Sequence, residues 1–213
     1  MSDHTPETQD APSEESKNDA IDTSRRKLTG TALGVAAVFT LASRPVWANQ
    51  CSISGMMSGN LSAPKVTCEG CTPGYWMQCQ HLDSWGPTGF KTDDLFNTVF
   101  GVTQYINPTN SKPYTLLQVL GLQGNGNCAP GTTQPNCSAK PHGNAIGNMG
   151  CDPVSVNLGF HAVAALLNAA HPSVNFGYTS GELIALFKSN YLKNPSGLKD
   201  SLAMLNERSC PLN

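Results

Sequence analysis

Apolar residues in the second half of the chain recur at the spacing of helices rather than of strands. The strongest pattern covers residues 155–171, where apolar side chains occupy most of the helical circumference. A helix that is apolar nearly all round is expected to be central and buried. No alternating run of apolar and polar residues is long enough to indicate a strand.

Four further segments carry an apolar stripe together with helix start and stop signals. Thr92 is expected to be the N-cap of the first segment, and Gly101 follows its last turn. Thr179 and Glu182 form a capping box at the start of a later one. The segments are 93–100, 115–120, 179–191, and one that starts at Pro195 and ends before Cys210. Together with the central helix they predict a mainly α fold of about five short-to-medium helices joined by long loops.

The stretch 68–85, called the signature stretch below, concentrates the residues with distinctive chemistry. It contains three cysteines, two tryptophans, a tyrosine and a histidine. Thr72-Pro73-Gly74 is a turn signal, because proline presets φ and glycine accepts a positive φ. We expect a disulfide-rich helical domain over 68–213, after a flexible lead-in at 49–67 that is rich in Ser, Gly and Asn.

The first 48 residues have the organisation of an export signal. Residues 1–23 are polar and acidic, and we expect them to be disordered. Residues 24–48 hold paired arginines, a weakly apolar run and small residues, which resembles a twin-arginine signal cleaved after Ala48. A retained membrane anchor is the alternative, but the run is shorter than the roughly 18–20 residues that cross a bilayer. The expected location is therefore periplasmic or extracellular, with no membrane attachment after cleavage.

All eight cysteines lie beyond the expected cleavage site. An even number of cysteines in an exported chain predicts four disulfides, although eight cysteines allow 105 pairings. We expect Cys128–Cys137 as a local bridge, because both lie in one loop, and we expect Cys210 to tie the last helix to the body of the domain. The disulfide candidates are Cys51, Cys68, Cys71, Cys79, Cys128, Cys137, Cys151 and Cys210.

Charge excludes one class of function. Residues 49–213 contain eight basic and eight acidic side chains, so their formal net charge is zero. No excess of positive charge is present to attract a phosphate backbone or an anionic lipid surface. We therefore expect no nucleic-acid partner.

Cys68, Cys71, Cys79 and His81 are candidate metal ligands. The C-x-x-C spacing of the first two suits tetrahedral zinc, which binds thiolate and imidazole. The alternative is that all three cysteines form disulfides after export. A thiol catalyst that pairs Cys71 or Cys79 with His81 or His161 would need a free thiol, which the even number of cysteines disfavours. We expect no cofactor, with zinc kept as the alternative.

Tyr75, Trp76 and Trp85, with Phe90 nearby, are candidates for an aromatic platform that stacks on sugars. The alternative is core packing, because small disulfide-rich domains need their aromatic residues inside. His161 is expected to be a hydrogen-bonded core residue rather than a ligand or base. The chain has no Gly-rich phosphate loop, G-x-S-x-G, H-E-x-x-H or EF-hand motif, and we assign no catalytic residue.

Residues 70–76, Gly-Cys-Thr-Pro-Gly-Tyr-Trp, resemble the opening of a module of secreted and surface-associated bacterial proteins with a GCTPGYWK-type motif. Further matches lie at 161–169 (His-Ala-Val-Ala-Ala-Leu-Leu-Asn-Ala), at 178–179 and at 210–212 (Cys-Pro-Leu). The resemblance covers 68–213 and departs from the family where Met77 replaces lysine and where 124–152 adds a cysteine-bearing loop. The family has no established activity, so the resemblance implies a surface-associated module and no catalytic residue.

These observations favour an exported, non-catalytic binding or assembly module at the cell envelope or surface. Its partner would be an envelope or extracellular protein or a glycan. One alternative is a metal- or redox-active periplasmic protein that uses Cys68, Cys71, Cys79 and His81. The other is a carbohydrate-acting protein with the aromatic platform described above.

Overall fold

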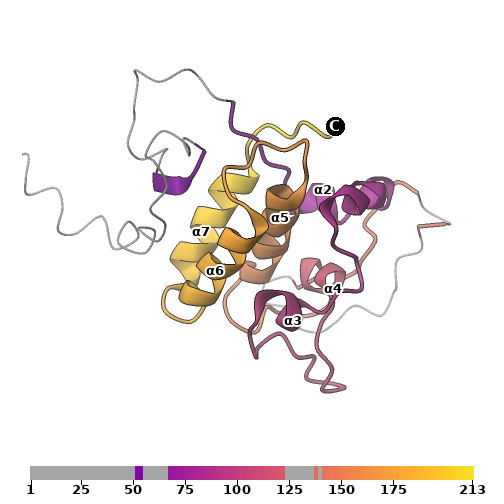
Figure 1. Cartoon of the computed structure of the whole chain (residues 1–213). Coiled ribbons are helices and arrows are strands. Elements are labelled where there is room, and N and C mark those ends of the chain that lie inside the picture. Colours follow the sequence, from indigo (N-terminus) through magenta and orange to yellow (C-terminus); the bar gives the residue numbers. More distant parts are fainter. Residues whose placement is uncertain (1–50, 55–66, 123–136, 139–140) are drawn as a thin grey trace, which may run out of the picture. The chain divides into compact units, whose positions relative to one another are not determined.

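The computed structural model describes residues 51–54, 67–122, 137–138 and 141–213 (Figure 1). All of them belong to one compact unit of the chain, Val35–Asn213. The expected disordered segment and the expected export signal lie outside the described residues, so both remain predictions.

The described residues form a mainly α, disulfide-stabilised domain, as the sequence predicts. Within the described ranges there is no strand, and the backbone pairs outside helices only at isolated β-bridges. The helices are α2 (Pro73–Trp76), the 3₁₀ helix η3 (Cys79–Thr88), α3 (Phe96–Phe100), α4 (Leu116–Leu120), α5 (Leu158–Ala170), α6 (Ser180–Asn190) and α7 (Pro195–Asn206). The five predicted segments correspond to α3–α7, and the signature stretch adds α2 and η3.

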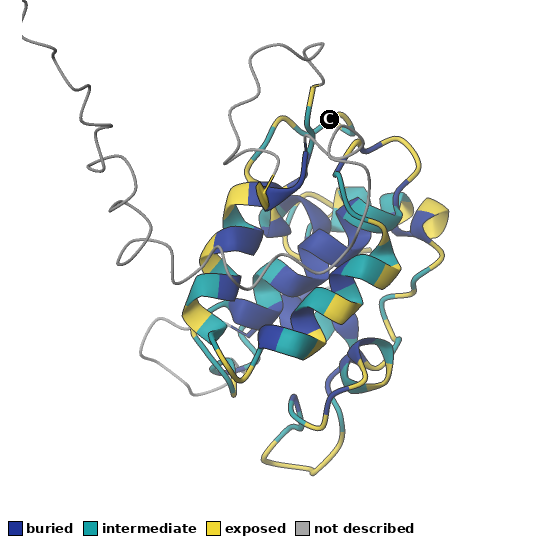
Figure 2. Cartoon of the chain, turned by 60° about the vertical axis from the view of Figure 1, so that its left-hand side comes forward, coloured by how far each residue is buried: buried dark blue, intermediate teal, exposed yellow. Residues whose placement is uncertain are grey.

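Helix α5 is the centre of the domain, as its apolar circumference predicts. It packs against α7, α4, α6, α2 and η3 (Figure 1). Residues 162–168 are buried without interruption. Figure 2 shows the buried residues gathered where the helices face one another, with exposed residues on the outer turns. Burying a helix on all sides in this way requires neighbours on every face, and the surrounding helices provide them.

The start of α5 differs from the prediction by three residues. The helix begins at Leu158 rather than at Ser155, because the residues before it form a turn around a carboxylate. Asp152 Oδ1 accepts the backbone N–H groups of Val154 (2.9 Å) and Ser155 (3.2 Å). Asn157, the N-cap position, then adopts the left-handed conformation with φ 60°, which breaks the helical backbone before Leu158.

Helix α3 also begins later than predicted. Thr92 is not its N-cap: the cap position is Leu95, which provides no side-chain hydrogen bond. The carbonyl of Thr92 instead accepts the N–H of Leu117, and that of Asp94 accepts the N–H of Leu116. Residues 92–94 are therefore engaged with the start of α4. The predicted stop is confirmed, because Gly101 ends the helix at φ 61°.

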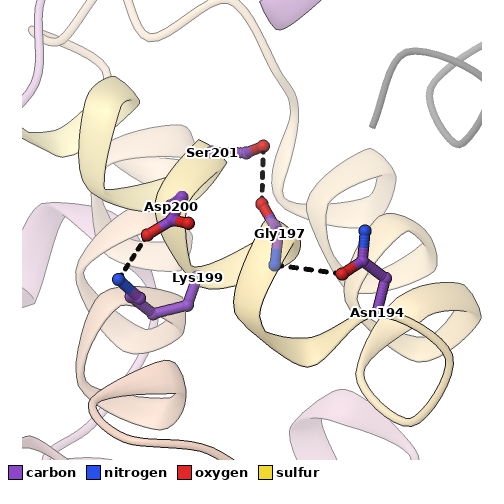
Figure 3. Close-up of polar contacts among 5 residues, drawn as sticks. All are labelled: Asn194, Gly197, Lys199, Asp200 and Ser201. Carbon is purple, nitrogen blue, oxygen red and sulfur yellow. Dashed lines mark hydrogen bonds and ion pairs between the residues drawn. The ribbon is translucent and has the colours of Figure 1, made fainter. Parts of the chain in front are cut away.

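The last two helices start as predicted. The Thr179–Glu182 capping box is present in both directions at the start of α6. Helix α7 begins at Pro195, after Asn194, whose Oδ1 accepts the N–H of Gly197 (Figure 3). Figure 3 also shows the ion pair of adjacent Lys199 and Asp200. Leu198, Leu202 and Leu205 form the predicted buried stripe of α7.

Three disulfides join the described residues: Cys51–Cys68, Cys71–Cys210 and Cys79–Cys137. Cys151 is disulfide-bonded as well, while Cys128 lies outside the described residues. The expected Cys128–Cys137 bridge is wrong, because Cys137 pairs with Cys79. Proximity in the sequence favours Cys128, whereas the fold brings Cys79 close. Cys210 does tie the end of α7 to the body of the domain, through Cys71.

Candidate functional site

The signature stretch is fastened to the central helix by one buried side chain. Asn168 of α5 accepts the N–H groups of Cys71 (2.9 Å) and the Trp76 indole (3.1 Å) on Oδ1. Its Nδ2 donates to the carbonyl of Cys71 and to Asn206 Oδ1. Asn206 Nδ2 in turn donates to the carbonyl of His161. Every polar atom of the fully buried Asn168 side chain is thus used inside the fold.

The three aromatic residues of the suggested platform lie in the core. The exposed fractions of Tyr75, Trp76 and Trp85 are 6%, 0% and 3%. Trp76 packs edge-on against both Tyr75 and Trp85, and the Trp85 indole donates to the Trp76 carbonyl. Phe90 is partly buried against the same core. Their flat faces are occupied by protein, so they do not form a surface on which a sugar ring could stack.

The candidate metal ligands are separated by their disulfides. Cys68, Cys71 and Cys79 each bond to a different cysteine, so none of them is a thiolate in this state. The ring of His81 stacks on that of Tyr75, with the ring centres 4.0 Å apart. Across the described part of the chain, no group of three or more His, Cys, Asp or Glu side chains is placed to hold a metal.

His161 lies on α5, partly buried, with an atypical environment. Its Nδ1 is buried and has no hydrogen-bond partner among the described residues. Burial is the main cause that lowers the pKa of His161 to about 4, and the charge of Lys199 adds to it while that of Asp200 opposes it. The backbone N–H and carbonyl of His161 are hydrogen-bonded, to Asn157 and Asn206, whereas the expected hydrogen bond of a core histidine is missing at its ring Nδ1.

A hollow of about 310 Å³ opens beside the start of α5. It is lined by the turn 106–109, by Tyr114 and by the segment 149–153. We call this concavity the hollow below. Its volume lies at the lower limit of ligand pockets, which span about 300–1,000 Å³. Sequence reasoning missed it, because its walls come from three segments that are separate in the chain.

Tyr105 and Asp152 hold the two walls of the hollow together. The Tyr105 hydroxyl donates to the Asp152 carboxylate, at 3.2 Å from Oδ1 and 3.3 Å from Oδ2. Asp152 Oδ2 also accepts the N–H of Gly159 at 2.6 Å. Burial raises the pKa of Asp152, opposed by these hydrogen bonds, and it raises the pKa of Tyr105. A Cβ at Gly159 would lie 2.6 Å from the Tyr105 ring, so glycine is required at this contact.

The backbone around the hollow is strained. Within the described ranges, three residues other than glycine have a positive φ: Tyr105 (66°), Ser111 (56°) and Asn157 (60°). Each lies within four residues of a segment that lines the hollow. A left-handed conformation is unusual for a bulky residue such as Tyr105 and persists only when the surrounding structure enforces it. Such residues concentrate at functional sites.

Three neutral polar groups at the hollow are left without internal partners. The Tyr114 hydroxyl, Asn107 Nδ2 and the Thr109 hydroxyl make no hydrogen bond within the part of the chain that the structure describes. Tyr114 is only 4% exposed, and burial raises its pKa. Its hydroxyl is not among the buried side-chain atoms without a partner, so it reaches solvent although most of the residue is buried. Because Tyr114 lines the hollow, this hydroxyl is a hydrogen-bonding group available to a ligand.

Fold and site together define a disulfide-stabilised helical domain with one small hollow described on it. A scan against protein-family models, a search of curated proteins and a search of solved structures each find no match to the chain. The resemblance to the GCTPGYWK-type module remains a prediction. None of the described helices has the length and apolar character needed to cross a bilayer. The three disulfides are compatible with an exported protein.

Proposed function

We propose that the protein is an exported, non-catalytic binding module of the cell envelope or surface, and that the hollow is its ligand site. The observation that carries this proposal is that Tyr114 lines the hollow while its hydroxyl makes no hydrogen bond within the described residues. By contrast, the candidate ligand-binding and reactive groups of the signature stretch are engaged in structural contacts. Its cysteines are in disulfides, and the Trp76 indole and the backbone of Cys71 are bound by Asn168.

Export itself is part of the proposal, since the twin-arginine-type segment lies outside the described residues. The disulfides support it, because such bonds form and persist in oxidising compartments. The full chain should be expressed in a bacterial host with a working twin-arginine pathway. Mass measurement of the product outside the cytoplasm tests the predicted cleavage after Ala48. A product that stays in the cytoplasm at full length contradicts export.

The binding test uses the exported, oxidised protein and isolated envelope material. Co-sedimentation should retain the protein, and Thr109→Trp should reduce the retention at least tenfold by filling the hollow from an exposed position. Ser196→Trp is the matched control, because Ser196 is exposed on α7 and does not line the hollow. Retention that is absent, or equal in the two variants, overturns the proposal.

A metal- or redox-active function would require reduced thiols at Cys68, Cys71 and Cys79. Thiol titration under denaturing conditions and elemental analysis of the exported protein decide this alternative. Free thiols in the exported product, or a stoichiometric metal, would favour it over the binding module.

A further inference from the structure

We infer that the ligand taken by the hollow is a neutral saccharide unit. This inference rests on the proposed function and adds the class of ligand. It follows from the charge of the lining, from the groups that remain free to bind, and from the apolar parts of the wall.

The charge of the described lining disfavours anionic ligands. Among the described residues that line the hollow there is no lysine, arginine or histidine. The only charged group on this described lining is Asp152, and its oxygens already accept the N–H groups of Val154, Ser155 and Gly159 and the hydroxyl of Tyr105. A phosphate or carboxylate would find no cation here, and an ammonium group would compete with four internal donors.

Several main-chain N–H groups of the residues that line the hollow are already used inside the fold. The N–H groups of Asn107 and Met149 donate to main-chain carbonyls, those of Thr109 and Gly150 donate to asparagine side chains, and two lining prolines have no N–H. An extended peptide is recognised mainly through such main-chain groups. With these N–H groups occupied, the lining is poorly suited to an extended peptide, and we expect side chains to contribute most of the recognition.

The free side-chain groups suit a polyhydroxylated ligand. Tyr114 and Thr109 offer hydroxyls that can donate or accept, and Asn107 Nδ2 offers two donors. Apolar atoms of Ile106, Pro108, Met149 and Pro153 form the remaining wall. A sugar ring presents neutral hydroxyls at its edge and C–H groups on its faces, which matches both parts of the lining. The volume of about 310 Å³ suits one such unit rather than a long oligomer.

The inference is tested with the exported, oxidised protein and defined probes. Saturation-transfer NMR and calorimetry would measure the binding of galactose, glucose, mannose and N-acetylglucosamine, their disaccharides, trialanine, inorganic phosphate and methylamine. A subset of the saccharides should bind. Tyr114→Phe, which keeps the ring and removes only the hydroxyl, should weaken that binding at least fivefold. Tyr75→Phe removes a hydroxyl bonded to Ser84 and Leu212, outside the lining of the hollow, and should leave it unchanged.

A second variant separates neutral from cationic ligands. Asn107→Asp keeps an oxygen for the N–H of Thr109 and replaces the Nδ2 donors by negative charge. Saccharide binding should weaken at least fivefold, whereas methylamine binding, if it occurs, would strengthen. Competition by free disaccharide against isolated envelope polysaccharide shows whether the natural source is a polymer or a free sugar.

The outcomes also distinguish this inference from the proposed function. Binding of trialanine, phosphate or methylamine that depends on Tyr114, without saccharide binding, overturns the saccharide inference and leaves the binding module standing. If neither Tyr114→Phe nor Asn107→Asp changes the affinity for the saccharide, the assignment of the binding site to the hollow is wrong. No binding by any probe, together with no retention on envelope material, overturns both.

Discussion

The indole N–H of Trp76 donates to Asn168 Oδ1 at 3.1 Å, in a place where neither side chain is exposed to solvent. The same oxygen accepts the N–H of Cys71, and Cys71 is bonded through sulfur to Cys210. One amide on the central helix thus joins the signature stretch, and through it the chain terminus, to the core. Residues 70–76 therefore have a structural role here: they connect the core to the C-terminal segment, and they do not form a reactive site.

Asn168→Leu is expected to destabilise the domain strongly. Leucine fills a similar volume but leaves the Trp76 indole, both backbone groups of Cys71 and Oδ1 of Asn206 without their partner in the core. Several unsatisfied buried groups should lower the free energy of unfolding by about 3–5 kcal/mol. Chemical denaturation followed by tryptophan fluorescence measures the change. Ser196→Ala, at an exposed position of α7, is the control and should stay within about 0.5 kcal/mol of wild type.

Gly70→Ala is expected to be destabilising because there is no space for a methyl group. An added Cβ would lie 2.3 Å from the carbonyl oxygen of Leu205 in α7, which belongs to the backbone and cannot rotate away. Relief requires a shift between the signature stretch and α7, at a cost of about 1–3 kcal/mol. Gly86→Ala is the matched control, since a Cβ added there would meet nothing within 4 Å. Equal melting temperatures for the two variants would contradict the contact.

Local signals predicted those parts of the fold that local chemistry determines. The Thr179–Glu182 box, the leucine stripe of α7 and the apolar circumference of α5 each depend on residues a few positions apart, and all are present. Thr92 failed as an N-cap because its carbonyl is used by α4, a contact between two elements. The shortened α5 has the same kind of cause, with Asp152 holding the preceding turn.

The candidate site could not be predicted from local sequence signals. Asp152 reaches Tyr105 and the wall that carries Tyr114 only when the turn 106–109 packs beside the segment 149–153, and the spacing of these residues in the sequence does not predict this packing. The left-handed conformation of Tyr105 is likewise imposed by tertiary contacts, since its residue type disfavours it. Pairing of Cys79 with Cys137 also follows from the fold, because sequence proximity pointed to Cys128 instead.

The disulfides differ in how much each should stabilise the domain. Cys71–Cys210 closes a separation of 139 residues and Cys51–Cys68 one of 17. In the chain-entropy model a longer loop constrains the unfolded chain more, so the first should contribute about 4–5 kcal/mol and the second about 3 kcal/mol. Thermal and chemical unfolding of the two double alanine variants gives the comparison. The expected order fails if the variant without Cys51–Cys68 is the less stable one.

Disulfide connectivity has a direct chemical test. Proteolysis of the oxidised, exported protein without reduction, followed by mass spectrometry, should yield a peptide pair that links Cys79 to Cys137. A Cys128–Cys137 pair would contradict the structure. Addition of reductant should lower the melting temperature, because removing native disulfides typically costs about 2–5 kcal/mol each.

His161 should make the domain less stable in mild acid. Its pKa is about 4 in the folded protein, against an ordinary value of 6.5, chiefly because burial disfavours the imidazolium. Between these two values the unfolded chain binds a proton that the folded chain does not. The free energy of unfolding is therefore expected to fall as the pH drops from about 7 to about 4. After a discount for partial exposure, the loss from this residue is about 1–3 kcal/mol.

His161→Leu isolates this contribution, because it removes the titrating ring and the buried Nδ1 that has no partner among the described residues. The lowered pKa of His171, also caused by burial, acts in the same direction and remains in the variant. The variant should therefore lose the His161 share of the pH dependence while keeping that of His171. Urea unfolding at pH 7, 5.5 and 4.5 measures the slope, with exposed His142→Leu as the control. A slope in His161→Leu as steep as in wild type would show that the acid sensitivity has another source.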